Sequence, residues 1–234
     1  MKGESRLCLN VLDETSGLQT EILEAGPVIS EAEWGELKVQ MARLAAESEF
    51  VVFSGSLPQG LSDDVYAQLI RIVYRHQAKP IVNTSGSALE KALAEKPFMV
   101  KPNRDKLAAM MQVDHMTETE ILKVIDRWSE QGIPLIVVSL GSDGALVAYG
   151  GQYFKATPPS IQAINRVGCG DTLVAGMAAG LIRGLEFEEI LSLATAAAAA
   201  NATEPQAGSV KLDKIHAYRE RVKINRIGRL EIDT

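Results

Sequence analysis

The order of short apolar runs and helix-forming segments between residues 31 and 140 restricts the fold more than any other feature of this sequence. Strands are predicted at 50–53, 80–83, 98–101 and 135–140, each preceded by one or more predicted helices. These runs are apolar throughout instead of alternating with polar residues, which is typical of parallel strands that helices bury on both faces. Sheets of this kind bind ligands beyond the carboxyl ends of their strands, so functional side chains are expected in the loops that follow.

The remaining segments complete an α/β pattern. Short strands are expected at 6–12 and 20–23 around a turn at 13–17, and a hairpin at 145–149 and 152–155. Further helices are predicted at 62–75, 87–94, 117–131, 171–183, 186–200 and 212–222, the last followed by a polar tail.

Capping signals mark the starts of three helices. Ser30 and Thr117 each have a glutamate three residues further on, which is the pattern of a capping box. Ser62 is expected to cap the helix that ends near Arg75.

Composition narrows the class of protein. The 234 residues are 46% hydrophobic and 23% charged with a formal net charge of −6, which is ordinary for a globular chain and unlike a disordered one. This acidic balance argues against non-specific nucleic-acid binding, and no apolar stretch is long enough to cross a bilayer. Cys8 and Cys169 form no CxxC pair, the three histidines stand apart, and no secretory signal is visible. We therefore expect a cytoplasmic protein that binds neither nucleic acid nor membrane.

The most informative motif is Asn-Arg-Val-Gly-Cys-Gly-Asp-Thr at residues 165–172. Its two glycines let the backbone approach a ligand closely, and they lie just before a predicted helix, whose free N–H groups attract anions. Asp171, in the first turn, can accept a proton from an attacking hydroxyl, an arrangement suited to phosphoryl transfer. The motif alone equally allows a tight turn whose aspartate only stabilises the helix dipole.

Two other strand-end segments carry polar residues or glycine. Lys101-Pro102-Asn103 follows one predicted strand, and Ser139-Leu140-Gly141-Ser142-Asp143-Gly144 follows another. No Walker A motif occurs, so a nucleotide-binding protein of this sequence needs a different phosphate cradle. The three segments can converge on one site, although each alone is also compatible with an ordinary loop.

Taken together, four motifs resemble those of the ribokinase (PfkB) family of carbohydrate kinases. They are Gly55-Ser56-Leu57-Pro58, Lys101-Pro102-Asn103, Val138-Ser139-Leu140-Gly141-x-x-Gly144 and Val167-Gly168-Cys169-Gly170-Asp171-Thr172-x-x-Ala175-Gly176. The resemblance runs in order from about Gly3 to Gly208 and is strongest to the 1-phosphofructokinase and tagatose-6-phosphate kinase branch. It implies an α/β, ribokinase-like (Rossmann-like) fold with a mostly parallel sheet flanked by helices. Residues 1–25 would be the remnant of a β lid, and 26–234 the nucleotide-binding and catalytic domain.

The resemblance also implies an activity: ATP-dependent phosphorylation of a hexose phosphate, fructose 1-phosphate or tagatose 6-phosphate, with ATP and Mg²⁺ as cofactors. It makes Asp171 the catalytic base, and it assigns the anion hole to Gly168, Cys169 and Gly170. The ATP site would be lined by Lys101, Asn103, Ser139, Gly141, Gly144 and Asn201. The sugar phosphate would be bound by Arg6 and Ser56. An exposed lid and an uncovered sheet edge favour a homodimer.

Three departures from the family pattern limit what the resemblance implies. No strand–helix region with a Gly-Gly motif precedes Gly3, so we expect the chain to lack the family's N-terminal part. Lys106 takes the position of a family glutamate that helps to organise Mg²⁺, which opposes a metal ion there and leaves the metal ligands unassigned. Cys169 replaces a small residue, and it is either passive or an oxidisable thiol whose pKa a helix N-terminus lowers. The alternative function is a non-catalytic or inactive nucleotide-binding fragment.

Overall fold

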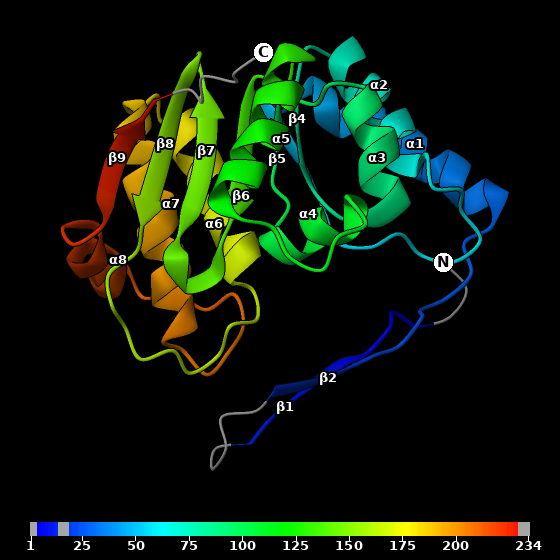
Figure 1. The fold of residues 1–234 in the computed structure, drawn as a ribbon. Coiled ribbons are helices and arrows are strands. Elements are labelled where there is room, and N and C mark those ends of the chain that lie inside the picture. The colour runs from blue at the N-terminus through cyan, green and yellow to red at the C-terminus, as the bar shows by residue number, and fades with distance from the viewer. Residues whose placement is uncertain (1–3, 14–18, 229–234) are drawn as a thin grey trace.

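The computed structural model describes residues 4–13 and 19–228 of the chain. In this part, seven strands form one sheet in the order β3-β4-β5-β6-β7-β8-β9, and two strands form a separate ribbon, β1-β2 (Figure 1). The strands of the large sheet are β3 (Phe50–Ser54), β4 (Lys79–Asn83), β5 (Met99–Val100), β6 (Leu135–Ser139), β7 (Ala145–Tyr149), β8 (Gln152–Thr157) and β9 (Lys223–Ile227).

The sheet has a parallel half and an antiparallel half. Parallel pairs join β3 through β6, and antiparallel pairs join β6 through β9. The residues of β4, β5 and β6 are almost all buried, as the apolar runs predicted for parallel strands. The carboxyl ends of four strands therefore meet along one edge of the sheet.

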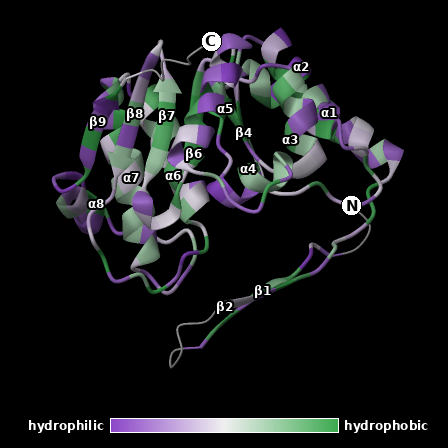
Figure 2. Ribbon diagram, viewed as in Figure 1, coloured by the Kyte–Doolittle hydropathy of each residue, from purple (hydrophilic) through white to green (hydrophobic). Residues whose placement is uncertain are grey.

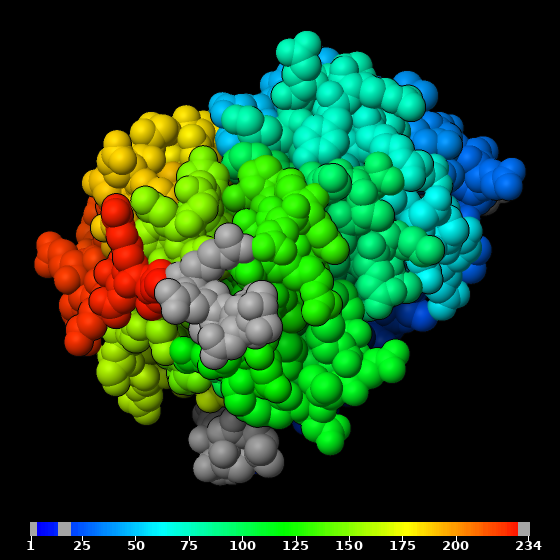
Figure 3. Space-filling view, turned by 45° about the horizontal axis from the view of Figure 1, so that its top comes forward, coloured from blue at the N-terminus to red at the C-terminus, as the bar shows by residue number. Residues whose placement is uncertain are grey.

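The last strand differs from the prediction. The helix expected over 212–222 is the shorter α8 (Leu212–Arg219), and β9 pairs with β8 where a polar tail was expected. In the space-filling view the red C-terminal segment lies at one side of the molecule (Figure 3), where β9 extends the sheet beside β8. β9 is an edge strand whose Lys223, Asn225 and Arg226 are exposed, so no apolar run announces it in the sequence.

Helices cover both faces of the sheet. One face carries α1 (Glu31–Ala46), α2 (Val65–Arg75), α3 (Gly86–Ala94), α4 (Arg104–Met110) and α5 (Glu118–Glu130); the other carries α6 (Cys169–Ile182) and α7 (Phe187–Ala202), with α8 packed on α7. Successive strand residues serve different cores. Ile81 and Met99 face α6 and α7, whereas Val82 and Val100 face the α1–α5 layer. This alternation explains why the strands are apolar throughout.

The helix starts show which capping signals operate. The capping boxes of Ser30 with Glu33 and of Thr117 with Glu120 are both present, so these two predictions are confirmed. The prediction for Ser62 is wrong, because α2 begins at Val65 with Asp64 at the N-cap position. The Ser62 hydroxyl donates to the Asp64 carboxylate instead, a local bond that competes with capping of the backbone.

The ribbon of β1 (Cys8–Leu12) and β2 (Gln19–Leu23) projects away from the helix-covered body (Figure 1). It agrees with the two strands expected there, and hydrophobic residues run along it (Figure 2). Most of the predicted turn at 13–17, Gly3 and the end of the polar tail lie outside the described residues. The division of the chain into 1–25 and 26–234 stays a prediction. Nowhere in the described ranges is a helix long and apolar enough to cross a membrane.

Candidate active site

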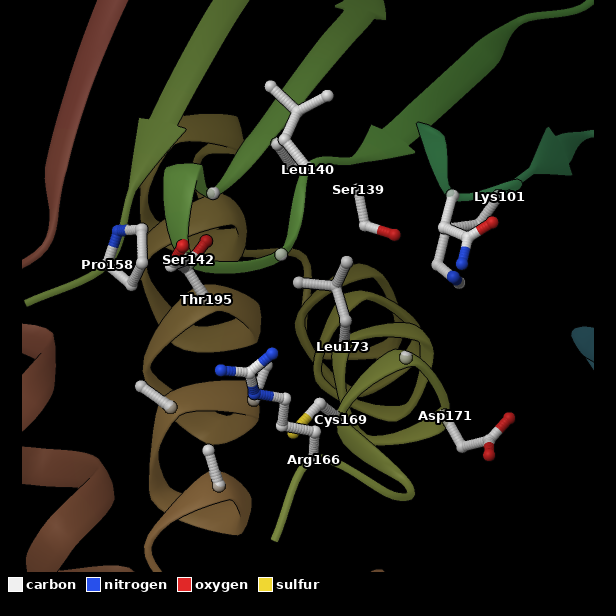
Figure 4. Close-up of a pocket in the computed structure, with 18 of the residues that line it drawn as sticks. Lys101, Ser139, Leu140, Ser142, Pro158, Arg166, Cys169, Asp171, Leu173 and Thr195 are labelled. Atoms are coloured by element: carbon white, nitrogen blue, oxygen red, sulfur yellow. The ribbon is translucent and has the colours of Figure 1, made fainter. Parts of the chain in front are cut away.

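Four parallel strands end at one cavity of about 1320 Å³. The last residues of β3, β4 and β6 and the residue after β5 line it: Ser54, Asn83, Ser139 and Lys101. The starts of α4 and α6, the loops after β6 and β8, and one side of α7 complete its walls (Figure 4). Most of the predicted site residues are on these walls, namely Lys101, Asn103, Ser139, Gly141, Gly144, Cys169, Gly170 and Asp171. The three strand-end segments that stand out in the sequence thus line a single cavity.

Asp171 lies in the first turn of α6, and two donors hold one of its carboxylate oxygens. Its Oδ1 accepts a hydrogen bond from the Ser54 hydroxyl at 2.7 Å and another from the Asn83 side-chain amide at 2.8 Å. The same amide lies 2.9 Å from Ser54 Oγ, so the three side chains form a closed network across β3, β4 and α6. Within the described residues nothing bonds Oδ2, which leaves that oxygen available to a ligand.

The turn before α6 presents unbonded N–H groups to the cavity. Gly168, the N-cap residue, has φ +80°, a left-handed conformation that favours glycine. The N–H groups of Gly170 and Asp171 have no acceptor in the part of the chain that the structure covers. Because α6 extends over 14 residues, the positive end of its dipole adds to these donors. The turn can therefore bind an anion.

Asn201 supports this turn from inside the protein. It is completely buried and does not line the cavity, contrary to the expectation that it borders the nucleotide. Its side-chain amide donates to the Val167 carbonyl at 2.8 Å, and its Oδ1 accepts from the Gly208 N–H at 2.6 Å. Asn201 thus joins the turn before α6 to the loop after α7.

Lys101 is buried near Asp171 and interacts with that carboxylate through charge, without a direct ion pair. Only 4% of its surface is exposed, and it makes no hydrogen bond or ion pair with any described residue. Its Nζ lies so close to Gly170 that a Cβ on that residue would be 3.1 Å away. Burial, and after it the charge of Lys106, lowers the pKa of Lys101 to about 8, and the charge of Asp171 opposes this shift. A buried cation of this kind is stabilised when an anion binds next to it.

The loops after β5 and β6 both line the cavity and are joined to each other. Asn103 is the N-cap of α4, and its Oδ1 accepts from the Lys106 N–H at 2.8 Å. Arg104 reaches Asp143, in the 3-10 turn η1 (Gly141–Asp143), at 3.2 Å. Because both side chains are partly exposed, this ion pair contributes little stability, but it sets the spacing of the two loops.

The thiol of Cys169 is half-buried at the start of α6. Burial raises the pKa of Cys169, and a hydrogen bond from the Asn201 amide at 3.2 Å offsets only part of this shift. The prediction of an oxidisable thiol therefore loses its physical basis, and the passive small residue is favoured. Arg166, three residues before Cys169, extends its guanidinium toward the cavity (Figure 4).

The predicted and the observed site residues differ at several positions. Arg6 and Ser56 are exposed, and neither lines the cavity; Gly168 supports the turn without lining it. Conversely, Ser54 and Asn83 bond Asp171 but were not predicted. Both stand at the carboxyl end of a strand, which is the signal that identifies them.

The side chains around the cavity fit a metal ion poorly. No three His, Cys, Asp or Glu side chains of the described residues are grouped so that they could hold an ion. The cation Lys106 lines the cavity, and Asp171 is already bonded through Oδ1. The Mg²⁺ that the resemblance implies therefore finds no site built from carboxylates of the described chain.

Comparison with known proteins identifies relatives of this chain. The model of the pfkB family of carbohydrate kinases matches residues 2–214. A tagatose-6-phosphate kinase of Staphylococcus epidermidis is 37% identical over 227 residues, which cover 96% of this chain and 73% of that protein.

Solved structures agree with the assignment. Phosphofructokinase-2 from Escherichia coli, in complex with potassium, has a TM-score of 0.85 at 29% identity, over 93% of this chain and 71% of that one. A possible 1-phosphofructokinase from Thermotoga maritima has a TM-score of 0.87 at 23% identity, over 97% of this chain and 72% of that one, which is a likeness of fold. The predicted ribokinase-like α/β fold is confirmed, and the chain belongs to the pfkB family of carbohydrate kinases.

Proposed function

We propose that this kinase transfers the γ-phosphoryl group of ATP to a hydroxyl of a hexose phosphate, which gives the bisphosphate. The observation that carries the proposal is the hydrogen-bonded carboxylate of Asp171. It lies in the same helical turn as the unbonded N–H groups of Gly170 and Asp171, on the wall of a cavity of about 1320 Å³. A base and an anion-binding turn must lie this close together to act on one transferring group.

In the proposed mechanism Asp171 is the catalytic base. Ser54 and Asn83 hold its Oδ1, so that Oδ2 faces the acceptor and takes the proton of the attacking hydroxyl. The hydroxyl oxygen forms a bond to the γ-phosphorus as the bond to the β-phosphate oxygen breaks, which leaves ADP. The turn of Gly168, Cys169 and Gly170 forms the proposed anion hole, in which the unbonded N–H groups of Gly170 and Asp171 stabilise the charge on the transferred group.

We propose that ATP lies along the cavity with its phosphates toward α6. Ser139, Gly141 and Gly144 would line its path, and Lys101 and Asn103 would lie near its phosphates. Mg²⁺ that accompanies ATP would be held by phosphate oxygens and water, because the described residues offer no carboxylate cluster.

For the acceptor we propose tagatose 6-phosphate or fructose 1-phosphate. A relative at 37% identity is named tagatose-6-phosphate kinase, which supports the first. Arg6 can neutralise the phosphate of the acceptor, and Ser56 lies two residues after Ser54, which bonds the base. Neither residue lines the cavity in this structure, so both must approach it when the acceptor binds.

The same positions of Arg6 and Ser56 also favour a second candidate function. A protein that binds the nucleotide but has no acceptor pocket would not catalyse phosphoryl transfer. Such a chain would be a non-catalytic nucleotide-binding member of the family. ATP binding without phosphoryl transfer distinguishes it from the kinase.

We also propose a homodimer that forms through the ribbon. Six apolar side chains on the ribbon and directly before it are between 38% and 71% exposed: Leu7, Leu9, Val11, Leu12, Ile22 and Leu23. A two-stranded ribbon has no core of its own, so contact with a second copy would bury these side chains. The free thiols of Cys8 and Cys169 support a cytoplasmic location.

Coupled ADP release tests the proposed reaction. Tagatose 6-phosphate, fructose 1-phosphate and fructose 6-phosphate are added separately to the chain with ATP, and glucose serves as the control without a phosphate. ADP release that requires one of the hexose phosphates supports the proposal. ATP binding without ADP release supports the binding protein, and the absence of both contradicts each candidate.

A further inference from the structure

The cavity has an excess of positive charge at the end where we place the phosphates. Among the charged residues on its walls, Lys101, Arg104, Lys106 and Arg166 are cationic, and Asp105 and Asp171 are acidic. Arg104 is already paired with Asp143, whereas Lys101 has no partner among the described residues. The charge balance of the cavity walls is therefore positive, which favours an anionic ligand.

Two of these cations are close enough to disturb each other. The charge of Lys106 is a cause, second to burial, of the lowered pKa of Lys101, so the two ammonium groups repel each other across the cavity wall. Lys106 is half-buried on α4, and Lys101 is buried directly after β5, so burial restricts the movement of Lys101 away from Lys106. A polyanion bound between them would remove this repulsion, whereas a divalent cation would add to it.

The same region offers a second, independent anion-binding element. The N–H groups of Gly170 and Asp171 are unbonded, and Gly170 lets Lys101 Nζ approach the start of α6. Two carboxylates, Asp105 and Asp171, line the cavity with these groups, but Asp171 uses Oδ1 to bond Ser54 and Asn83, and no cluster of three metal-ligating side chains occurs among the described residues. The residues present are therefore those of a phosphate site and not those of a metal site.

We propose that Lys101 and Lys106 bind the terminal phosphates of the nucleotide directly and replace the divalent cation in nucleotide binding. The chain then binds free ATP about as tightly as its magnesium chelate. This inference rests on the proposed function only for the identity of the polyanion. It concerns binding of the donor and leaves the proton transfer to Asp171 unchanged.

Calorimetric titration with ATP tests the proposal on the full chain, once in excess EDTA and once in excess Mg²⁺. For the wild-type chain we expect the two dissociation constants to agree within about threefold, because the lysines supply the neutralising charge. Lys106→Gln is expected to weaken binding in EDTA by about tenfold, the loss of one charge-assisted hydrogen bond. Lys106→Glu is expected to bind ATP in Mg²⁺ and to lose binding in EDTA.

The matched control is Lys123→Gln, which removes an exposed lysine of α5 that does not line the cavity. It should bind ATP like the wild type in both buffers, and thermal unfolding of each variant checks that it is folded. Binding by the wild type that is more than tenfold tighter in Mg²⁺ than in EDTA would overturn the inference and leave the kinase proposal standing. Absence of ATP binding in both buffers would contradict the proposed function as well.

Discussion

The walls of the cavity and the β1–β2 ribbon are built in opposite ways. Behind the cavity, Val82, Val100 and Ile136 have no exposed surface, because helices cover both faces of the parallel strands. On the ribbon, Leu9 is 56% and Leu23 is 58% exposed. The strands that carry the proposed ATP-binding residues are thus held in place by the core. The ribbon, which is the proposed lid, has no such packing within the described residues. Single substitutions at the cavity should therefore alter ATP binding or turnover. Substitutions on the ribbon should instead alter whether two chains associate.

The largest effect is expected from removing the base in the rigid region. Asp171→Asn keeps the shape of the side chain but not its ability to take a proton, so turnover should fall by about 1000-fold. The dissociation constant of ATP should change by less than about threefold, because the base acts on the acceptor. Coupled ADP release and ATP titration measure the two quantities.

Asp213→Asn is the control for this variant, because Asp213 also lies in the first turn of a helix, α8, and is exposed. It should leave turnover unchanged. Equal turnover of Asp171→Asn and the wild type would rule out the proposed base.

The buried charge of Lys101 should lower the free energy of unfolding while it strengthens ATP binding. The pKa of Lys101 is lowered from 10.5 to about 8, so the unfolded chain binds more protons between these values. The free energy of unfolding of the wild type should therefore rise as the pH increases from about 8 to about 10.5. Lys101→Met should lack this rise, be more stable at pH 7 by up to about 3 kcal/mol, and bind ATP about tenfold more weakly.

Denaturant unfolding at pH 7 and pH 10 measures both stability effects. Lys123→Met removes an exposed lysine and serves as the control. If Lys101→Met is less stable than the wild type at pH 7, the side chain is not the unpaired buried cation described above.

Asn201 tests how the rigid region holds its anion-binding turn. Asn201→Ala leaves the Val167 carbonyl and the Gly208 N–H without their partner, which should cost about 2 kcal/mol of unfolding free energy. The turn should also bind ATP more weakly, although Asn201 does not line the cavity. Asn225→Ala, at an exposed position of β9, should change the unfolding free energy by less than about 0.5 kcal/mol. Unchanged stability of Asn201→Ala would contradict its supporting role.

The smallest effect on stability is expected on the ribbon. Leu9 and Ile22 are Cα partners in adjacent strands, so their side chains share one face. Replacing both with Glu should change the unfolding free energy of the monomer by less than about 0.5 kcal/mol, since both are exposed. The same change should convert the proposed dimer to a monomer in light-scattering chromatography.

Leu212→Glu, at a 72% exposed leucine of α8, should leave the dimer intact. A wild-type chain that is monomeric at all concentrations would contradict the proposed role of the ribbon.

The contrast also explains what could be predicted from the sequence. Strands buried on both faces have unbroken apolar runs, and the two capping boxes are local patterns, so these elements were predicted correctly. β9 was missed because an exposed edge strand depends on its neighbour β8, which is distant in sequence. The cap at Ser62 was wrong because its hydroxyl bonds a nearer carboxylate.

The candidate site shows the same division. The three strand-end segments were recognised because glycine, proline and charged residues follow apolar runs. The bonds from Ser54 and Asn83 to Asp171 join residues 117 and 88 positions apart, and no local pattern encodes such contacts. The burial of Lys101 likewise depends on the packing of distant segments, which the Lys-Pro-Asn motif does not reveal.

The central claim is that this cavity transfers the γ-phosphoryl group of ATP to a hexose phosphate. Phosphorus-31 NMR of the chain with ATP and tagatose 6-phosphate tests it most directly, because the spectrum follows donor and acceptor together. We predict loss of the γ-phosphate signal and equal growth of ADP and of a second phosphate-monoester signal on the sugar, with neither change for Asp171→Asn in the same time. Inorganic phosphate in place of the sugar bisphosphate, or equal conversion by the variant, would contradict the claim.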